Sequence, residues 1–358
     1  MTEPRALDRL WWGDELLVRA ARISLFPLEL GYAAAVRMRN LLYDRHLLPT
    51  IPPALPALSV GNVTVGGTGK TPVAAWLVQR LAERGARPAV VLRGYGEDEP
   101  LVHHHLAPRI PIVVSVDRLA GIRRAAQLHA DVVVLDDAFQ HRRAGRLADV
   151  VLVSADRFAP RQRLLPAGPL REPLDSLRRA ALVVVTRKAA TREDAEEVAR
   201  ALRRWAPTVS CAGMHLALGG LRAVDAEADG EAPLAGLAGR RVLVVAAVGD
   251  PRALIRQIAA TGALVRFSIF PDHHRFTPED AVRLASAADA GEMIVCTLKD
   301  AVKLRRFWPR EAPPLWYVSQ QVVPEFGADA LDRIVADVLA ARPASPSTAA
   351  PWRASPPL

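Results

Sequence analysis

The stretch that decides the fold is Gly61-Asn62-Val63-Thr64-Val65-Gly66-Gly67-Thr68-Gly69-Lys70-Thr71-Pro72. The apolar run at residues 57–60 is typical of a buried strand, and residues 72–83 are typical of a helix. A glycine-rich turn between a strand and a helix lets successive backbone N–H groups converge on phosphate oxygens. The stretch therefore predicts a nucleotide-binding loop at the start of an α/β domain.

Two residues at the end of this loop carry its chemistry. The Lys70 ammonium is expected to reach the β- and γ-phosphates, and the Thr71 hydroxyl is expected to hold Mg²⁺. Thr64 stands where the usual pattern G-x-x-x-x-G-K-[ST] has its first glycine, so we expect Gly66 and Gly67 to supply the flexibility. The predicted nucleotide-binding residues are Asn62, Thr64, Val65, Gly66, Gly67, Thr68, Gly69, Lys70 and Thr71.

A pair of carboxylates follows a second apolar run. Asp136 and Asp137 come directly after residues 132–135, which are typical of a buried strand. Carboxylates at the C-terminal end of such a strand, beside the phosphate loop, can hold Mg²⁺ directly or through water. With Thr71 they are the predicted metal ligands, and the sequence leaves open which aspartate touches the ion. The two motifs predict nucleotide hydrolysis or phosphoryl transfer and leave the acceptor open.

The remaining apolar runs alternate with helical segments and predict an α/β fold. Further strands are expected near 89–92, 111–116, 150–153 and 182–186, and helices at 118–128 and 192–205. A second set of strands is expected near 242–248, 264–270, 293–297 and 315–318. We expect a P-loop NTPase-like doubly wound parallel sheet with a second, smaller α/β domain. The predicted division is a helical region at 1–48, a P-loop domain at 49–208, a linker with extended segments at 209–240, the smaller domain at 241–342 and a disordered tail at 343–358.

The N-terminal region mixes large apolar residues, among them Trp11, Trp12 and Phe26, with scattered arginines. We expect one or two helices there, broken near Pro27 and Gly31. Tryptophan at headgroup level and arginine against lipid phosphate predict a helix in a membrane interface, and a helix packed on the domain core is the alternative. No apolar run near this end reaches the about 20 residues that a spanning helix needs.

Composition narrows the partners without choosing one. The 358 residues are 50% hydrophobic and 24% charged, which excludes a disordered or collagen-like chain. A net charge of +9 indicates an anionic partner: nucleic acid, an acidic membrane face or a phosphate-bearing substrate. Two distant cysteines, Cys211 and Cys296, suggest neither a disulfide framework nor a zinc site. We also expect no secretory signal.

Further stretches resemble the tetraacyldisaccharide 4′-kinase family, the lipid A 4′-kinases. They are RGYG and EDEP at 93–100, LLPAGPLREP at 164–173, FPDHH at 270–274 and TLKDAVK at 297–303. The loop GNVTVGGTGKTP and the segment DDAFQHR also look like the motifs of that family, in its order. One departure is that only Glu97 separates Gly96 from Asp98, where family members carry a longer insert and a glycine at the position of Glu97.

The resemblance implies transfer of the γ-phosphate of ATP, with Mg²⁺, to the 4′-hydroxyl of a lipid-linked glucosamine disaccharide. It implies a peripheral enzyme on the cytoplasmic face of the inner membrane, docked on an anionic membrane surface and binding no nucleic acid, and it favours membrane docking over core packing for the N-terminal helix. By resemblance Asp98 and His273 form the catalytic dyad, assisted by Lys70. A carboxylate can accept the proton of a sugar hydroxyl while an imidazole orients it.

Other residues are assigned to the substrate or to the scaffold. Contacts with substrate or phosphate are predicted for Tyr95, Glu99, Arg118 and Arg171. The run His103, His104 and His105 is interpreted as a solvated loop, because adjacent residues cannot all face one ion. Lys299-Asp300 is interpreted as an ion pair at a helix start.

Two rival functions use the same nucleotide loop. A nucleotide-dependent switch or partitioning ATPase acting on a partner or DNA would explain Lys70 and Asp136, but gives no reason for Asp272-His273-His274. A membrane scaffold that merely binds nucleotide is disfavoured by the intact Lys70 and Thr71.

Overall fold

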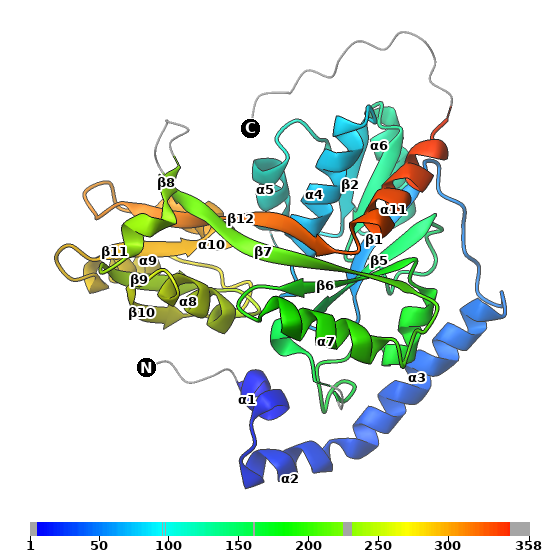
Figure 1. Ribbon diagram of the computed structural model, residues 1–358, viewed down its shortest axis with the longest axis horizontal. Helices are drawn as coiled ribbons and strands as arrows, with labels where there is room; N and C mark the ends of the chain where they lie inside the picture. The colour runs from blue at the N-terminus through cyan, green and yellow to red at the C-terminus, as the bar shows by residue number, and fades with distance from the viewer. Residues whose placement is uncertain (1–5, 95, 97, 160–161, 225–230, 344–358) are drawn as a thin grey trace.

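The computed structural model describes residues 6–94, 96, 98–159, 162–224 and 231–343 (Figure 1). In the first α/β region the elements are β1 (Ala57–Asn62), α4 (Lys70–Glu83), β2 (Pro88–Leu92), α5 (Asp98–Leu106), β3 (Ile112–Val114), α6 (Arg118–Gln127), β4 (Val132–Asp136), β5 (Ala148–Ser154), β6 (Leu182–Arg187) and α7 (Arg192–Leu202). The second α/β region contains β9 (Arg241–Ala246), α8 (Pro251–Ala259), β10 (Leu264–Ile269), α9 (Pro278–Ala287), β11 (Met293–Thr297) and α10 (Leu298–Leu304). Two long strands, β7 (Ser210–Ala223) and β12 (Leu315–Phe326), join the regions, with the short β8 (Ala232–Pro233) beside β7.

These strands form one 12-stranded sheet, in which eleven strands follow the order β10-β9-β11-β12-β7-β6-β5-β1-β4-β2-β3 and β8 pairs with β7 off this path. Neighbours along this order are parallel except at β12 and β7, which pair antiparallel (Figure 1). The expected α/β class and large, mostly parallel sheet are confirmed. Strands from the ranges 49–208, 209–240 and 241–342 all belong to one sheet, so the sheet itself does not mark where one domain ends and the next begins. The predicted domain boundaries stay a prediction.

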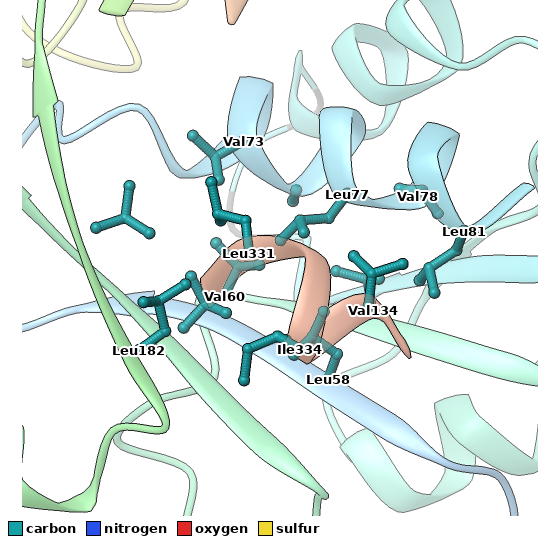
Figure 2. Packing of buried hydrophobic residues seen from close by; sticks show 14 of the residues in the cluster. Leu58, Val60, Val73, Leu77, Val78, Leu81, Val134, Leu182, Leu331 and Ile334 are labelled. Atoms are coloured by element: carbon teal, nitrogen blue, oxygen red, sulfur yellow. The ribbon is translucent and has the colours of Figure 1, made fainter. Parts of the chain in front are cut away.

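The core beneath the nucleotide loop explains why that loop is held firmly. The strand β1 is buried along its whole length, and the apolar face of α4 packs on it through Val73 and Leu77. The last helix, α11 (Ala328–Ala340), returns to this first region and adds Leu331 and Ile334 to the same cluster (Figure 2). Both ends of the loop at 61–72 are therefore anchored in a dry core, as the strand-turn-helix pattern requires.

The segment at 209–224, which the sequence predicts to be extended, lies inside the sheet. Residues 210–223 form one continuous strand, which pairs in parallel with β6 on one side and antiparallel with β12 on the other. The glycines and alanines of this segment permit a long strand with close neighbours: a Cβ at Gly213 would lie 2.1 Å from the ring of Phe326. The link between the two regions is thus a two-stranded ribbon inside the sheet.

The N-terminal part forms three helices, α1 (Ala6–Trp12), α2 (Leu16–Ser24) and α3 (Phe26–Asp44). Pro27 lies in the first turn of α3, where proline is tolerated, but the expected break at Gly31 is wrong because α3 continues through it. The indole of Trp11 donates a hydrogen bond to the carbonyl of Pro166 over 3.0 Å, so this tryptophan is partly engaged with the protein. None of the described helices is long and apolar enough to cross a bilayer.

The stretch with three histidines is the clearest correction of local structure. Residues 98–106 form α5 rather than a solvated loop, and His103 is fully buried there. The first turn of α5 contains Asp98, Glu99 and Pro100, and acidic residues and proline are common at the start of a helix. The polar histidines that follow gave no apolar pattern from which a helix could be predicted. The expected tail lies outside the described residues except for Pro343.

Candidate active site

The nucleotide loop curves tightly between β1 and α4. Gly69 ends it in a left-handed conformation with φ of +84°, and a Cβ there would lie 2.2 Å from the Leu216 side chain, so only glycine fits without rearrangement. The buried Asn62 amide donates to the Thr68 hydroxyl over 3.0 Å, which fixes the shape of the loop from inside. Thr64 forms a bridge with Leu170 instead of facing the cavity, whereas residues 65–71 line it.

Charged side chains gather where β4 ends beside this loop. Lys70 Nζ lies 3.7 Å from Asp137 Oδ1, and the Arg171 guanidinium donates to both Asp137 oxygens over 3.0 and 3.1 Å. Burial raises the pKa of Asp137, but Lys70 and Arg171 outweigh it, so the net shift is downward. Asp137 has a left-handed backbone with φ of +50°, which is strained for a non-glycine residue and typical of a functional turn.

Asp136 is held from two sides. The Arg118 guanidinium, predicted to contact substrate or phosphate, donates to the Asp136 backbone carbonyl over 2.8 Å. His103 Nε2 lies 2.8 Å from Asp136 Oδ2, and because a carboxylate only accepts, the ring nitrogen is the donor. Asp136 Oδ1 is buried without a hydrogen-bond partner among the described residues.

These donors fit a magnesium ion shared with a nucleotide. Within the described part of the chain, no three His, Cys, Asp or Glu side chains are grouped to hold a metal ion by themselves. Magnesium usually takes only one or two carboxylates, with phosphate oxygens and waters completing its shell. The orphaned Oδ1 of Asp136, the Asp137 carboxylate and the Thr71 hydroxyl, which lies on the cavity wall, are the kind of donors this arrangement needs.

A cavity of about 1170 Å³ extends from the nucleotide loop to the second region. Its wall includes Glu99, Arg118, Asp137, Arg171 and His273, which come from five separate segments of the chain. Such a volume exceeds what a nucleotide alone needs, because ligand sites for drug-sized molecules run to about 300–1,000 Å³. The cavity is thus roomy enough for a second substrate beside the nucleotide phosphates.

The structure brings the buried Asp98 next to His273, which lies on the cavity wall. Asp98 begins α5 in the first region, and His273 follows β10 in the second, yet His273 Nδ1 lies 3.6 Å from Asp98 Oδ1. A Cβ on Gly96 would lie 2.1 Å from Asp98 Oδ1 and 3.0 Å from His273 Nδ1, so glycine permits this approach. His273 has a strained left-handed backbone with φ of +59°.

Asp98 is strongly held in its anionic form. Its side chain is 3% exposed, and burial alone would raise its pKa. Contact with the His273 ring and the charges of Lys299 and Lys303 more than offset burial and lower the pKa of Asp98 to about 2. The neighbouring Glu99 behaves oppositely, because burial and the charge of Asp136 raise its pKa.

Sequence reasoning missed several residues of this site. The expected ion pair between Lys299 and Asp300 is wrong. Lys299 lies 3.3 Å from Asp272 and 3.6 Å from Asp98, while Asp300 pairs with Lys303. Lys188, at the end of β6, donates to the Gly67 carbonyl over 3.0 Å. The scarcity of lysine in the chain is a signal that could have pointed to both. Tyr95, the remaining predicted substrate contact, lies outside the described residues.

The loop at 163–172 connects the N-terminal helices to the nucleotide loop. On one side Val65 N–H donates to the Pro169 carbonyl over 2.8 Å, and Arg171 N–H donates to the Val63 carbonyl over 2.8 Å. On the other side α3 holds the fully buried Glu172 through Arg39 and Asn40, over 2.8 and 2.9 Å. The loop is therefore a shared wall between α3 and the site.

Comparison with known proteins gives one consistent result. A family model described as tetraacyldisaccharide-1-P 4′-kinase matches residues 21–100 and 97–340. The tetraacyldisaccharide 4′-kinase of Anaeromyxobacter dehalogenans (strain 2CP-C) is 37% identical over 331 residues, covering 83% of this chain and 86% of that protein. The protein of the same name from Halorhodospira halophila is 37% identical over 336 residues, covering 88% of this chain and 91% of that protein.

A solved structure agrees with this likeness over most of the fold. The crystal structure of the "apo" form of LpxK from Aquifex aeolicus in complex with ATP has a TM-score of 0.68 and 27% sequence identity. The likeness covers 89% of this chain and 99% of that one, so it includes both α/β regions.

Proposed function

The chain belongs to the tetraacyldisaccharide-1-phosphate 4′-kinase family, and from this premise we propose how its own residues phosphorylate the lipid A precursor. The reaction moves the γ-phosphate of ATP to the 4′-hydroxyl of the disaccharide. The observation that carries the proposal is the placement of Asp98 and His273, 3.6 Å apart, beside the cavity that also holds the nucleotide loop. No observation in the structure favours a switch ATPase or a scaffold.

The nucleotide loop is proposed to bind the phosphates of ATP. Residues 66–69 and the N-terminus of α4 line the cavity, where backbone N–H groups of a glycine-rich turn can bind phosphate oxygens, and Lys70 is the mobile charge that follows the γ-phosphate. Asp137, which Arg171 holds by an ion pair, keeps Lys70 near this position. The solved relative is in complex with ATP, which supports ATP as the nucleotide.

The Asp98–His273 pair is proposed to take up the proton of the acceptor. As the 4′-oxygen forms its bond to the γ-phosphorus, the bond from that phosphorus to the leaving ADP oxygen breaks, and the hydroxyl proton passes to the Asp98 carboxylate. A carboxylate with a pKa of about 2 is a weak base, so it accepts the proton late, once bond formation has made the hydroxyl acidic. His273 orients the carboxylate and shares the charge.

Magnesium is proposed to be held by Asp136 and Asp137 with Thr71. When bound, it neutralises the phosphate oxygens and makes the γ-phosphorus easier to attack. His103 and Arg118 hold Asp136 in place through the contacts described above.

The N-terminal helices are proposed to dock on the anionic membrane surface that contains the substrate, on the cytoplasmic face of the inner membrane. Leu16 and Leu17 of α2 are 84% and 83% exposed, and Ile23 and Leu28 continue the apolar surface. One face of α3 packs on the protein, while other apolar residues of the helix are exposed and are available for the proposed docking. Exposed leucines with nearby arginines are typical of an interfacial helix.

The dyad is tested by a double-mutant cycle on the purified kinase with detergent-dispersed substrate. Asp98→Ala and His273→Ala are each expected to lower kcat by ~10²–10⁴. The double variant should be little worse than the poorer single one, because residues that act as a unit are not additive. His274→Gln is the matched control: this adjacent histidine contacts Asp280 over 2.9 Å and should leave kcat unchanged. Independent, multiplying losses would show that Asp98 and His273 are not partners.

A further inference from the structure

Lysine is rare in this chain, and its positions are not scattered. Only four of the 47 basic residues are lysine, and the rest are arginine. Lys70, Lys188 and Lys299 line the same cavity, and Lys303 Nζ lies 4.0 Å from the Asp98 carboxylate. Since arginine supplies nearly every other positive charge, this clustering indicates that the site needs a property of the ammonium group itself.

Lys299 has the surroundings that most clearly require an ammonium. Its Nζ lies 3.1 Å from His273 Nε2, 3.3 Å from Asp272 Oδ1 and 3.6 Å from Asp98 Oδ2. A lysine ammonium is compact and directs three N–H donors from one atom, whereas a guanidinium spreads its donors across a rigid plane. Three acceptors grouped around one nitrogen therefore match lysine and not arginine.

The contact with His273 determines which ring nitrogen carries the proton. An ammonium can only donate, so His273 Nε2 must offer its lone pair to Lys299. In a neutral imidazole the proton then sits on Nδ1, which is the atom that faces Asp98. The ring is partly exposed on a strained backbone, and its Nδ1 and Nε2 atoms contact Asp98 and Lys299 respectively.

We propose that Lys299 is a positioning residue of the phosphoryl transfer, which fixes His273 as the Nδ1–H tautomer facing Asp98. The proposal rests on the Asp98–His273 dyad proposed above. Lys303, one turn further along α10, is also near Asp98, but its shorter contacts differ: it pairs with the buried Asp300 over 3.4 Å and donates to the His274 carbonyl over 3.2 Å. Lys299 thus acts on the ring, and Lys303 on the backbone next to it.

The test uses the full-length kinase with Lys299→Met and Lys299→Arg. Both variants should lower kcat by about 10²-fold while the KM for ATP stays unchanged, because the phosphates are bound by the nucleotide loop. The arginine variant separates the geometry from the charge, since it keeps the positive charge. Arg306→Met is the matched control: it removes an exposed positive charge just after α10 and should keep the wild-type kcat.

NMR of protein labelled with ¹⁵N-histidine measures the tautomer. The signals of His273 are assigned as those that disappear in the His273→Gln variant. The wild type should show His273 protonated at Nδ1, and both Lys299 variants should show a mixture of tautomers, unlike Arg306→Met. An unchanged tautomer or an unchanged kcat in Lys299→Met would overturn the proposal. Full activity in Lys299→Arg would also overturn it, because charge alone would then suffice.

The outcome also separates this inference from the dyad on which it rests. If Asp98→Ala and His273→Ala leave kcat unchanged, the dyad is wrong and the role of Lys299 fails with it. If those variants are inactive while the Lys299 variants keep both kcat and the tautomer, only the role of Lys299 fails. Thermal melting of each variant confirms that the comparison is made on folded protein.

Discussion

Removing the carboxylate of Glu172 is expected to destabilise the fold strongly, because this buried group joins three segments. Glu172 is 0% exposed, and it accepts hydrogen bonds from Arg39, Asn40 and Arg179 over 2.8, 2.9 and 2.9 Å. Breaking a buried ion pair by removing one partner costs about 3–5 kcal/mol, since the remaining charge stays buried without compensation. The Arg39 side chain is 36% exposed and can be partly rehydrated, so we expect about 3 kcal/mol for Glu172→Ala.

The assay is urea unfolding followed by the fluorescence of the seven tryptophans. Glu196→Ala is the matched control, because Glu196 pairs with Arg192 on the surface of α7 and should cost less than about 1 kcal/mol. Arg39→Met should recover part of the loss when it is combined with Glu172→Ala, since it removes one of the uncompensated charges. A Glu172→Ala variant within about 1 kcal/mol of Glu196→Ala would refute the reasoning.

The same residue predicts a pH dependence with a definite sign. Burial raises the pKa of Glu172, but Arg179, Asn40 and Arg39 outweigh it and hold the pKa below its usual value of 4.5. A carboxyl with a lowered pKa in the folded state contributes stability that is fully present above its unfolded pKa and is lost as the pH falls through its folded pKa. The stability difference between the wild type and Glu172→Gln should therefore be largest near neutral pH and shrink in acid below pH 4.5.

Two further outcomes are expected. Lys70→Ala should lower kcat by about 10³-fold, because it removes the charge that stabilises the transferred phosphate. The melting temperature should not change, because Lys70 lies on the cavity wall, and near-normal turnover would contradict the assignment of the nucleotide loop. Leu16→Ser combined with Leu17→Ser should weaken binding to vesicles containing anionic lipid and lower activity on bilayer substrate more than on detergent-dispersed substrate; equal losses in both assays, or unchanged vesicle binding, would contradict membrane docking.

The nucleotide half of the site could be predicted because its signals are local. The residues of the loop at 61–72 are consecutive, and Asp136 and Asp137 directly follow an apolar run whose neighbours in a parallel sheet are easily inferred. The structure places Lys70 and Asp137 3.7 Å apart, as that inference requires. Local pattern and parallel-sheet topology are sufficient when both partners lie at strand ends on the same edge.

The other half could not be read from local pattern. His103 is polar and therefore adds nothing to an apolar periodicity, so its buried position in α5 next to Asp136 could not be predicted from the pattern. Gly31 has a low helix propensity, yet α3 continues through it because packing on the protein outweighs the cost of one glycine. Lys299 was assigned to its sequence neighbour Asp300, whereas its partners Asp98 and Asp272 are distant in sequence, and only the fold brings them close.

The position of the dyad depends on how the two regions are joined. Asp98 belongs to α5 in the first region, whereas His273 and Lys299 belong to the second, so neither region alone contains the complete arrangement. A flexible linker would let the two parts drift by more than the fraction of an ångström that hydrogen bonding tolerates. Here the antiparallel β7–β12 ribbon continues the sheet from one region to the other. The Tyr317 hydroxyl of β12 also lies 2.8 Å from His105 Nε2 of α5. The ribbon and this contact fix α5 against the second region, which is why residues so far apart in sequence can act as one site.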